Sequence, residues 1–269
     1  LDENGYSIPI ITTLHGTDIT LVGNHPFYKP AVTFSINKSD IVTCVSNSLR
    51  DDTREFFGIK RDIEVIPNFI DIDKYDKKHH LCERNMIAQG EEKIIVHVSN
   101  FRPLKRIIDV LKIFDKISQK INSKLIMVGD GPDKKKAKDF LRKNDLKNKV
   151  IFLGKTNEVD EILCSSDLFL LPSEKESFGL AALEAMALKI PVISSNVGGL
   201  KELNINGNSG YTSEVGDIES MANNAIEILS NEKLENKFKT QAFENAKKYD
   251  IKKVIPLYEA IYKRAIKKS

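Results

Sequence analysis

Short runs of β-branched residues alternate with longer amphipathic stretches along this chain of 269 residues. Such alternation is typical of a parallel sheet between layers of helices. Between two of the predicted strands, apolar residues recur at helical spacing from Ile107 to Ile117. The sequence therefore predicts an α/β fold of the doubly wound kind. The predicted strands are Pro9–Leu14, Ile41–Val45, Ile63–Ile66, Lys93–Val98, Ser123–Val128, Lys149–Phe152, Leu168–Leu171 and Pro191–Ser194.

The strands fall into two groups, which predict two Rossmann-like domains. A polar segment between Asn68 and Gly90 separates the groups, so we place the first domain at residues 1–69 and the second at residues 70–251. The second group makes a complete domain of five strands, whereas the first contains only about three and is expected to lack its opening strands. Near the end of the chain, an apolar stripe from Val254 to Ala265 predicts a helix, whose packing partner the spacing leaves open.

Composition excludes several classes of protein. Lys and Arg number 41 against 38 Asp and Glu, and the lysines of Lys134–Lys138 suit a solvated helix face, so nucleic acid is not an expected partner. Cys44, Cys82 and Cys164 are odd in number and lack CxxC spacing, which predicts neither a disulfide framework nor a zinc site and fits a reducing cytoplasm. No apolar run approaches the roughly 20 residues of a membrane span.

The densest chemical signal follows the predicted strand Leu168–Leu171. A loop from Pro172 turns into a nearly all-apolar helix, Ala181–Leu188. Open α/β sheets bind ligands at the carboxyl ends of their strands, and the free N–H groups at a helix start suit a phosphate. Those groups would come from Ser177, Phe178, Gly179 and Leu180.

Two glutamates accompany this helix. Glu184 stands in its middle, where an ionised carboxylate costs several kcal/mol unless it is paired or hydrogen-bonded. Its partner is either the hydroxyl pair of a ribose or a Lys, Arg or backbone N–H of a neighbouring loop, and position alone does not decide. Glu176 lies eight residues earlier. Helical rise would separate the carboxylates by roughly 12 Å, the span from ribose to hexose across a diphosphate.

Cations and a histidine follow two other predicted strands. Arg102 and Lys105 come after Lys93–Val98 and could converge on the same anion, although surface cations at a helix start are the alternative. His15 follows Pro9–Leu14 and can reach into a cleft, but a lone histidine is more often structural. His97 lies within a strand and is predicted to be a core residue.

Two motifs resemble sites that the chain is not expected to have. Asp71-Ile72-Asp73 matches a metal-binding Asp-x-Asp, but it lies in the predicted connection and not between strands of a sheet. Gly129-Asp130-Gly131-Pro132 follows a strand, yet it lacks the third glycine of a dinucleotide-binding loop, and Pro132 removes a donor. We therefore expect neither metal nor dinucleotide binding.

Together these features resemble the retaining glycosyltransferases of family 4. Glu176 and Glu184 match the family's E-x7-E motif, and Arg102, Lys105 and the Val197-Gly198-Gly199 loop also fit. Within the family, the likeness is greatest to members that attach N-acetylglucosamine to L-malate, the first step of bacillithiol biosynthesis. The stretches that carry it are Leu14–Thr20, Ser99–Arg106 and Ser173–Leu180.

The resemblance implies a GT-B fold, in which two Rossmann-like domains face a cleft. It implies UDP-N-acetylglucosamine as donor, L-malate as acceptor, retained configuration, and neither metal nor other cofactor. Glu184 would bind the uridine ribose, Glu176 the hydroxyls of the donor sugar, and Arg102 with Lys105 the diphosphate, while His15 would face the donor sugar. Attack would come from the front face, with the departing phosphate oxygen accepting the proton of the acceptor.

The same resemblance implies that the terminal helix, residues 252–269, packs back on the first domain. It also implies that roughly 100 residues, including a Gly-rich loop, are absent from the first domain. Two other functions stay open: a family 4 transferase with another acceptor, such as a cell-surface glycan, and a UDP-sugar-binding fragment without activity. The sequence leaves a homo-oligomer open as well.

Overall fold

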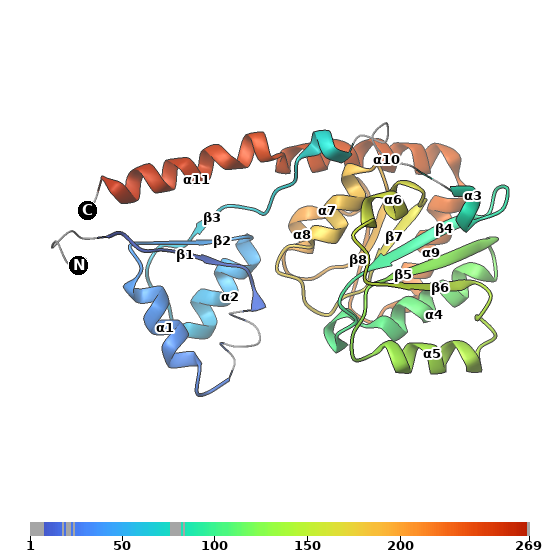
Figure 1. The fold of residues 1–269 in the computed structure, drawn as a ribbon, viewed down its shortest axis with the longest axis horizontal. Coiled ribbons are helices and arrows are strands. Elements are labelled where there is room, and N and C mark those ends of the chain that lie inside the picture. The colour runs from blue at the N-terminus through green and yellow to red at the C-terminus, as the bar shows by residue number, and fades with distance from the viewer. Residues whose placement is uncertain are drawn as a thin grey trace. The chain divides into compact units, whose positions relative to one another are not determined.

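The computed structural model of the chain describes residues 8–267 except 18, 20–22, 24, 76–81 and 83 (Figure 1). Its contacts group the residues into two compact units. Unit 1 comprises Leu1–Ile70, Glu176–Phe178 and Tyr249–Ser269, and unit 2 comprises Asp71–Lys175 and Gly179–Lys248. None of the helices in the described part of the chain is long and apolar enough to cross a membrane.

Unit 1 contains a three-stranded parallel sheet in the order β1-β2-β3. The strands are β1 (Ile11–Leu14), β2 (Ile41–Cys44) and β3 (Glu64–Val65), and the helices are α1 (Lys29–Lys38), α2 (Asn47–Phe57) and α11 (Ile251–Ile266). Ser46 begins α2, because its side chain accepts a hydrogen bond from the Leu49 backbone N–H at 3.1 Å. Gly58 ends the helix in the left-handed region, with φ of 65°.

Part of the apolar stripe of α11 is buried within unit 1, whereas Leu257 and Tyr262 are exposed. Val254, Ile261 and Ala265 form one cluster with Ile41 and Ile66. Backbone hydrogen bonds fix the start of the helix, since the Ile70 N–H donates to Tyr249 and the Ile251 N–H donates to Ile70, at 3.0 and 2.8 Å. The helix therefore supplies part of the core over the short sheet of this unit.

Unit 2 contains a six-stranded parallel sheet in the order β6-β5-β4-β7-β8-β9. Its strands are β4 (Lys93–Val98), β5 (Ser123–Val128), β6 (Val150–Gly154), β7 (Leu168–Leu171), β8 (Val192–Ser195) and β9 (Gly210–Ser213). Its helices are α3 (Arg84–Ile87), α4 (Ile107–Ser118), α5 (Lys134–Lys143), α6 (Val159–Cys164), α7 (Leu180–Ala187), α8 (Leu200–Leu203), α9 (Ile218–Ser230) and α10 (Glu232–Ala246). Short 3-10 turns include η2 (Ile72–Tyr75) and η4 (Pro103–Lys105).

The winding of this sheet reverses between β4 and β7. The chain passes from β4 outwards through β5 and β6, then returns to β7 and continues through β8 and β9. Such a reversal is the topological switch point, where open α/β sheets bind ligands beyond the carboxyl ends of the strands. The α/β class and the doubly wound parallel sheet are thereby confirmed.

The prediction of five strands in the second domain was wrong by one. Gly210-Tyr211-Thr212-Ser213 pairs in parallel with Val192–Ser195 and forms the sixth strand. This segment has no apolar alternation, and only its position beside β8 makes it a strand. The core of the unit instead follows the predicted pattern, because Val110, Leu111 and Phe114 of α4 are fully buried.

The expectation that the cysteines form no disulfide was wrong. Cys82 and Cys164 form a disulfide with a Cα–Cα distance of 5.5 Å, whereas Cys44 is a buried thiol. The two half-cystines are 82 residues apart in sequence. Their spacing therefore carried no signal, and they meet because the segment before β4 folds back on the end of α6.

Candidate functional site

Two loops meet at the switch point of unit 2. One follows β4 and covers residues 99–106; the other follows β7 and covers residues 172–175 of this unit. The Glu174 N–H donates to the carbonyl of Leu104 at 2.8 Å, and the guanidinium of Arg106 lies 3.7 Å from the Glu174 carboxylate. Brändén's rule therefore places the candidate site at these loops.

A buried histidine links the two strands beneath the loops. His97 Nδ1 lies 2.8 Å from the carbonyl oxygen of Leu170, and Nε2 lies 2.8 Å from Ser99 Oγ. Burial lowers the pKa of His97 to about 4, although the Leu170 bond opposes the shift, and the charge of Lys105 lowers it further. The ring is thus neutral, with Nδ1 donating and Nε2 accepting, and its assignment to the core is confirmed.

The structure separates the three cations of the first loop. Arg106 adopts φ of 51° and pairs with Asp109, so it fixes the start of α4. Arg102 precedes η4 and is exposed, and in the described part of the chain its side chain has no hydrogen bond or ion pair. Lys105 is half-buried and close enough to His97 to affect the pKa of that ring. Arg102 is therefore available to an anion.

Two glycines outside the predicted site shape the same loop. A Cβ atom on Gly129 would lie 1.8 Å from the Ser99 carbonyl oxygen, and one on Gly131 would lie 2.1 Å from the Asn100 carbonyl oxygen. Glycine at these positions lets the loop after β5 pack directly on the backbone that leads to Arg102. The Gly129-Asp130-Gly131 motif thus has a structural role, which explains why it lacks a complete dinucleotide-binding pattern.

The second loop leads into α7 through a left-handed glycine. Gly179 has φ of 98°, and a Cβ atom there would lie 2.6 Å from Cδ2 of Leu200. The first intrahelical acceptor is the Gly179 carbonyl, to which Ala182 and Leu183 donate. The N–H groups of Gly179, Leu180 and Ala181 therefore precede the first helical bond and suit an anion.

Glu184 of α7 is half-buried, and its carboxylate has no hydrogen bond or ion pair with any described residue. Burial raises its pKa to about 7, and the nearby charge of Asp160 raises it further. The sequence left two kinds of partner open for Glu184: a ribose, or a protein group such as a lysine, an arginine or a backbone N–H. No such protein group is found among the residues that the structure describes. Because residues 76–81 lie outside the described part of the chain, the ribose hydroxyl stays a prediction as the partner of this group.

Tyr75 and Asp160 surround Glu184 and were missed by sequence reasoning. Packing of η2 and of α6 against α7 brings their side chains near the Glu184 carboxylate. Burial raises the pKa of Tyr75 well above its usual range, and the charges of Glu184 and Asp160 add to the shift. Tyr75 lies in the polar connection and Asp160 in a short helix, so neither stood out in the sequence.

The interval from Glu176 to Glu184 is not a continuous helix, and the distance between their carboxylates stays a prediction. Because α7 begins at Leu180, only half of the interval to Glu184 is helical, and a rise per residue does not give the distance between the carboxylates. Glu176, Ser177 and Phe178 group with unit 1, in which the Ser177 hydroxyl donates to the carbonyl of His15 at 2.7 Å. The side chain of His15 is exposed after β1. Two residues of its motif, Asp18 and Thr20, lie outside the described residues.

The Asp71-Ile72-Asp73 motif folds into the turn that starts η2. The Asp73 N–H donates to Asp71 Oδ1 at 3.2 Å. Across the described residues, no group of three or more His, Cys, Asp or Glu side chains could hold a metal ion. Metal independence itself remains a prediction.

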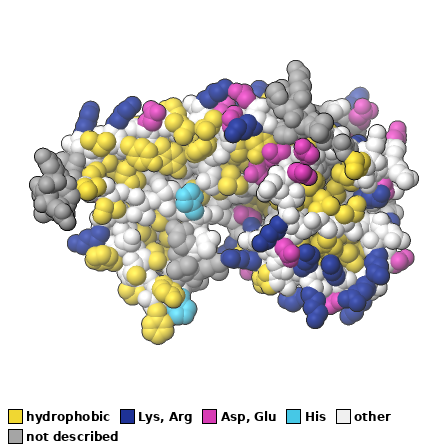
Figure 2. All heavy atoms as spheres, in the orientation of Figure 1, with side chains coloured by type: hydrophobic (Ala, Val, Ile, Leu, Met, Phe, Trp, Pro, Cys, Tyr) yellow, Lys and Arg dark blue, Asp and Glu magenta, His cyan; other side chains and the backbone are white. Residues whose placement is uncertain are grey.

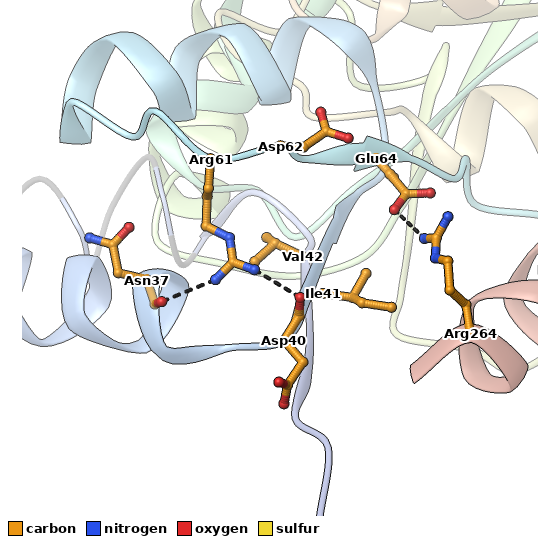
Figure 3. Close-up of a pocket in the computed structure, with 8 residues that line it drawn as sticks. All are labelled: Asn37, Asp40, Ile41, Val42, Arg61, Asp62, Glu64 and Arg264. Carbon is orange, nitrogen blue, oxygen red and sulfur yellow. Dashed lines mark hydrogen bonds and ion pairs between the residues drawn. The ribbon is translucent and has the colours of Figure 1, made fainter. Parts of the chain in front are cut away.

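A pocket of about 490 Å³ lies elsewhere, in unit 1 (Figure 3). It is at the amino-terminal ends of β2 and β3, the opposite edge from the one at which parallel sheets bind ligands. Its walls carry both signs of charge, and Arg264 pairs with Glu64. The pocket is therefore not the candidate site. Its lining residues are Asn37, Asp40, Ile41, Val42, Arg61, Asp62, Glu64 and Arg264.

Lysines and arginines gather over α5 in unit 2 (Figure 2). Lys135, Lys136 and Lys138 are exposed on that helix, whereas Ala137 and Leu141 face the core. This arrangement is the solvated helix face that the sequence predicted. It gives no aromatic platform of the kind that nucleic-acid binding uses.

The comparisons with known proteins assign the family. Residues 83–245, more than half of the chain, match the glycosyl transferases group 1, and residues 3–74 match glycosyltransferase family 4. The chain belongs to these glycosyltransferases. It is a hexosyltransferase, and the resemblance to family 4 that its sequence indicated is confirmed.

A curated relative supports the same family, and solved structures share the fold. The glycosyltransferase is 42% identical over 260 residues to N-acetyl-alpha-D-glucosaminyl L-malate synthase of Bacillus anthracis, covering 96% of the chain and 68% of the relative. Sucrose-phosphate synthase from Thermosynechococcus elongatus superposes with a TM-score of 0.86 at 19% identity, over 99% and 70% of the two chains. Anabaena HepE, solved with UDP and glucose, gives 0.83 at 21% identity, over 95% and 71%. The predicted GT-B fold is confirmed.

Proposed function

We propose that this glycosyltransferase moves N-acetylglucosamine from UDP-N-acetylglucosamine to the hydroxyl of L-malate with retention, the first step of bacillithiol biosynthesis. The observation that carries the donor assignment is Glu184, a half-buried carboxylate without a described protein partner, on the helix that starts at the switch point. The Bacillus anthracis relative is named for N-acetylglucosaminyl-malate synthesis. HepE was solved with UDP in complex. These names support UDP-linked N-acetylglucosamine and malate as the substrates.

The donor would lie along the carboxyl edge of the sheet. Glu184 accepts hydrogen bonds from the two ribose hydroxyls, because a carboxylate presents two acceptor oxygens to neighbouring hydroxyl groups. The backbone N–H groups of Ser177, Phe178, Gly179 and Leu180 bind the diphosphate at the start of α7. Glu176 binds hydroxyls of the donor sugar, and His15 faces that sugar. These roles follow the family motif, residue by residue.

Catalysis depends on stabilising the negative charge of the leaving group. The exposed guanidinium of Arg102 and the ammonium of Lys105 neutralise the charge that develops on the departing UDP, and such preorganised charge is often the largest catalytic contribution. The malate hydroxyl attacks from the same face, and the leaving phosphate oxygen takes its proton. The chain's own residues thus bind and orient both substrates and stabilise charge, and no metal or other cofactor is needed.

Three further assignments belong to this proposal. The first 69 residues, with the terminal helix, form the acceptor-side domain, and residues 70–251 form the domain that binds the nucleotide sugar. The partners are small molecules, and a homo-oligomer remains open. The protein works in the cytoplasm.

Release of UDP from UDP-N-acetylglucosamine, measured with and without L-malate, tests the reaction. We expect release to depend on malate and a new glycosyl-malate to accumulate. Malate-independent release, or transfer only to a glycan acceptor, would contradict the malate assignment and favour another family 4 activity. Binding of UDP without any turnover would favour a nucleotide-binding fragment.

Calorimetric titration with UDP tests the donor residues separately. Loss of a hydrogen-bonded carboxylate costs about 1.5–3 kcal/mol, so Glu184→Ala should weaken UDP binding about 10-fold to 100-fold. Glu219→Ala, at an exposed position of α9, is the matched control and should bind like the wild type. Unchanged UDP affinity in Glu184→Ala would remove the ribose assignment.

Steady-state kinetics test the leaving-group role. Arg102→Ala should lower kcat about 100-fold, the usual loss for one preorganised donor at a developing charge. A higher KM with unchanged kcat would show instead that Arg102 only binds the ground state.

A further inference from the structure

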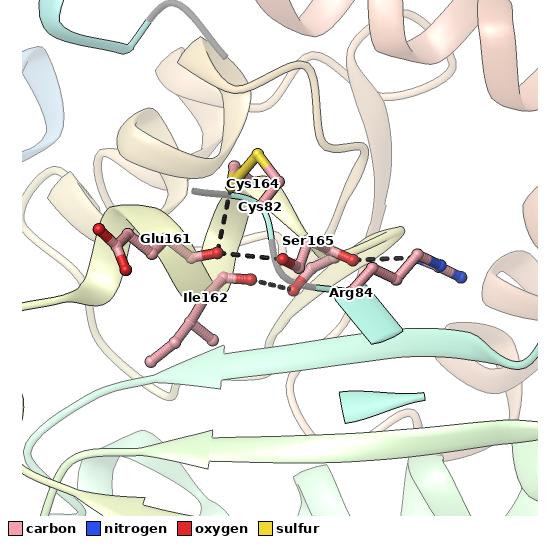
Figure 4. Close-up of a disulfide and its surroundings, with 7 residues drawn as sticks. Cys82, Arg84, Glu161, Ile162, Cys164 and Ser165 are labelled. Carbon is pink, nitrogen blue, oxygen red and sulfur yellow. Dashed lines mark hydrogen bonds between the residues drawn. A yellow bond between two sulfur atoms is a disulfide. The ribbon is translucent and has the colours of Figure 1, made fainter. Parts of the chain in front are cut away.

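The Cys82–Cys164 disulfide joins the segment before β4 to the end of α6 (Figure 4). We call residues 71–92, which run from η2 to β4, the connection. Cys82 is exposed on the connection, whereas Cys164 is 5% exposed. Cys82 is therefore the more accessible of the two half-cystines to a thiolate from solution.

Arg84 anchors the connection at the same place without a covalent bond. Its guanidinium donates to the carbonyls of Ser165 and Glu92, at 2.9 and 2.7 Å. It also pairs with Asp167 at 2.8 Å. The connection is thus held twice to the segment between α6 and β7, and breaking the disulfide would leave the ionic anchor in place.

The carbonyl oxygen of Glu161 can accept a hydrogen bond from Cys164 once the disulfide is reduced. Cys164 Sγ lies 3.2 Å from the Glu161 carbonyl oxygen (Figure 4). A disulfide sulfur carries no hydrogen, so in this structure the contact is a close approach only. After reduction, the Cys164 thiol can donate to that carbonyl. Reduction therefore leaves the buried sulfur with a hydrogen-bond partner.

The Cys164 side of the disulfide lies on a helix that packs near Glu184. The connection carries Tyr75, seven residues before Cys82, and α6 carries Asp160, four residues before Cys164. Both η2 and α6 pack against α7, which carries Glu184. The disulfide therefore restrains α6, one of the elements that surround the Glu184 carboxylate.

We propose that Cys82–Cys164 is a site of reversible thiol–disulfide exchange, and that its oxidised form strengthens binding of the nucleotide-sugar donor. The inference rests on the proposed function of Glu184. In a reducing compartment, disulfides are usually transient and redox-sensing, so a pair with one exposed half-cystine suits such a role.

The exchange partner is a low-molecular-weight thiol. Its thiolate attacks Cys82 Sγ, the bond between the two cysteine sulfurs breaks, and Cys164 leaves as a thiolate that takes up a proton. A second thiol then attacks the mixed disulfide and releases Cys82 as a thiol. Two small thiols are oxidised to one disulfide, while the protein disulfide is reduced to two thiols.

Thiol counting in denaturant tests the pair itself. Of the three cysteines, the oxidised protein should expose one reactive thiol and the reduced protein three. Equilibration in buffers of oxidised and reduced glutathione should give a reversible transition between these counts. Three thiols under all buffer ratios would overturn the proposal.

Calorimetry with UDP tests the coupling to the donor site. Because coupling between sites is typically fivefold or more, reduction should weaken UDP binding of the wild type at least about fivefold. Cys82→Ser should bind like the reduced wild type whether or not reductant is present. The matched control, Cys44→Ala, removes the thiol outside the pair and should still respond to reduction.

The outcomes separate this inference from the proposed function. Equal UDP affinity in the oxidised and reduced proteins would overturn the coupling while leaving the donor site intact. Absence of UDP binding in both states would contradict the proposed function. If UDP does not bind, limited proteolysis still tests the redox role. Equal cleavage of the connection in the oxidised and reduced proteins would overturn it.

Discussion

His97 Nδ1 lies 2.8 Å from the carbonyl oxygen of Leu170, and this hydrogen bond joins β4 to β7 where the winding of the sheet reverses. The loops that carry Arg102 and Gly179 both start from this pair of strands. Because the imidazole is fully buried and neutral, it holds the base of the candidate site without adding charge to it.

The neutral state of His97 predicts a loss of stability in mild acid. The pKa is about 4 in the folded protein and near 6.5 when unfolded, so the unfolded state binds more protons between these values. The contribution of His97 is fully present above about pH 6.5 and is lost as the pH falls towards 4. From about pH 7.5 to about pH 5, the unfolding free energy should fall by about 2 kcal/mol on this account.

Urea unfolding of His97→Gln at the two pH values measures that contribution. The variant has no imidazole to protonate there, so its stability should depend less on pH than that of the wild type. His25→Gln, at an exposed position, is the matched control and should keep the wild-type dependence. The same pH dependence in His97→Gln and in the wild type would show that other groups cause the acid loss.

The environment of Glu184 predicts that donor binding depends on pH. Its pKa is about 7 without ligand, raised by burial and then by Asp160. The ionised form accepts ribose hydroxyls, so binding should favour loss of the proton and strengthen as the pH rises. UDP-N-acetylglucosamine should bind about tenfold more weakly at about pH 6 than at about pH 8.

Asp160→Asn tests the cause of this dependence. Removal of the neighbouring negative charge lowers the pKa of Glu184, so the midpoint of the affinity change should move to lower pH. In Glu184→Gln the dependence should disappear, since the amide does not titrate. Calorimetry with the intact nucleotide sugar is the suitable measurement, because UDP itself has a terminal phosphate that titrates near neutral pH. A midpoint unmoved in Asp160→Asn would exclude this electrostatic cause.

Sequence patterns predicted the elements that depend on local apolar periodicity. The predicted strands Lys93–Val98, Ser123–Val128 and Leu168–Leu171 agree with the structure at both ends, because most residues of each are buried. The strand Gly210–Ser213 was missed, since its pairing with β8 comes only from tertiary position. The Cys82–Cys164 disulfide was missed for the same reason.

The residues of the candidate site also fall into those that sequence patterns predicted and those that depend on tertiary packing. Glu184 could be selected from sequence, because a carboxylate in an apolar helix needs a partner wherever the helix lies. Arg102 could be selected because it follows a strand. Tyr75 and Asp160 could not, since their importance comes from the packing of η2 and α6 on α7. The roles of Glu176 and His15 remain predictions from the family motif.

Gly179→Ala should damage both stability and donor binding. The substitution would place a Cβ atom 2.6 Å from Cδ2 of Leu200 in a residue with φ of 98°. Strain of this kind costs about 1–3 kcal/mol, and relief would shift the start of α7. Gly154→Ala is the control, because Gly154 also has positive φ, at 75°, but nothing lies within 4 Å of the added carbon. Only Gly179→Ala should weaken UDP binding, and equal affinities would show that α7 does not position the donor.

Arg61 predicts a stability effect that is separate from donor binding. Its guanidinium donates to the carbonyls of Ile36 and Asn37, at 2.8 and 3.1 Å, and also to those of Ser39 and Asp40. It thereby satisfies the free carbonyls at the end of α1.

Arg61→Met should leave these carbonyls without their donor and lower the unfolding free energy by about 2 kcal/mol. Arg61→Lys should restore less than half of the loss, because a single ammonium cannot reproduce the planar fork of a guanidinium. Urea unfolding measures both variants, and calorimetry with UDP should give wild-type affinity, since Arg61 lies at the amino-terminal edge of β3 in unit 1. Full recovery in Arg61→Lys would mean that charge near α1, and not the geometry of the fork, supports the helix end.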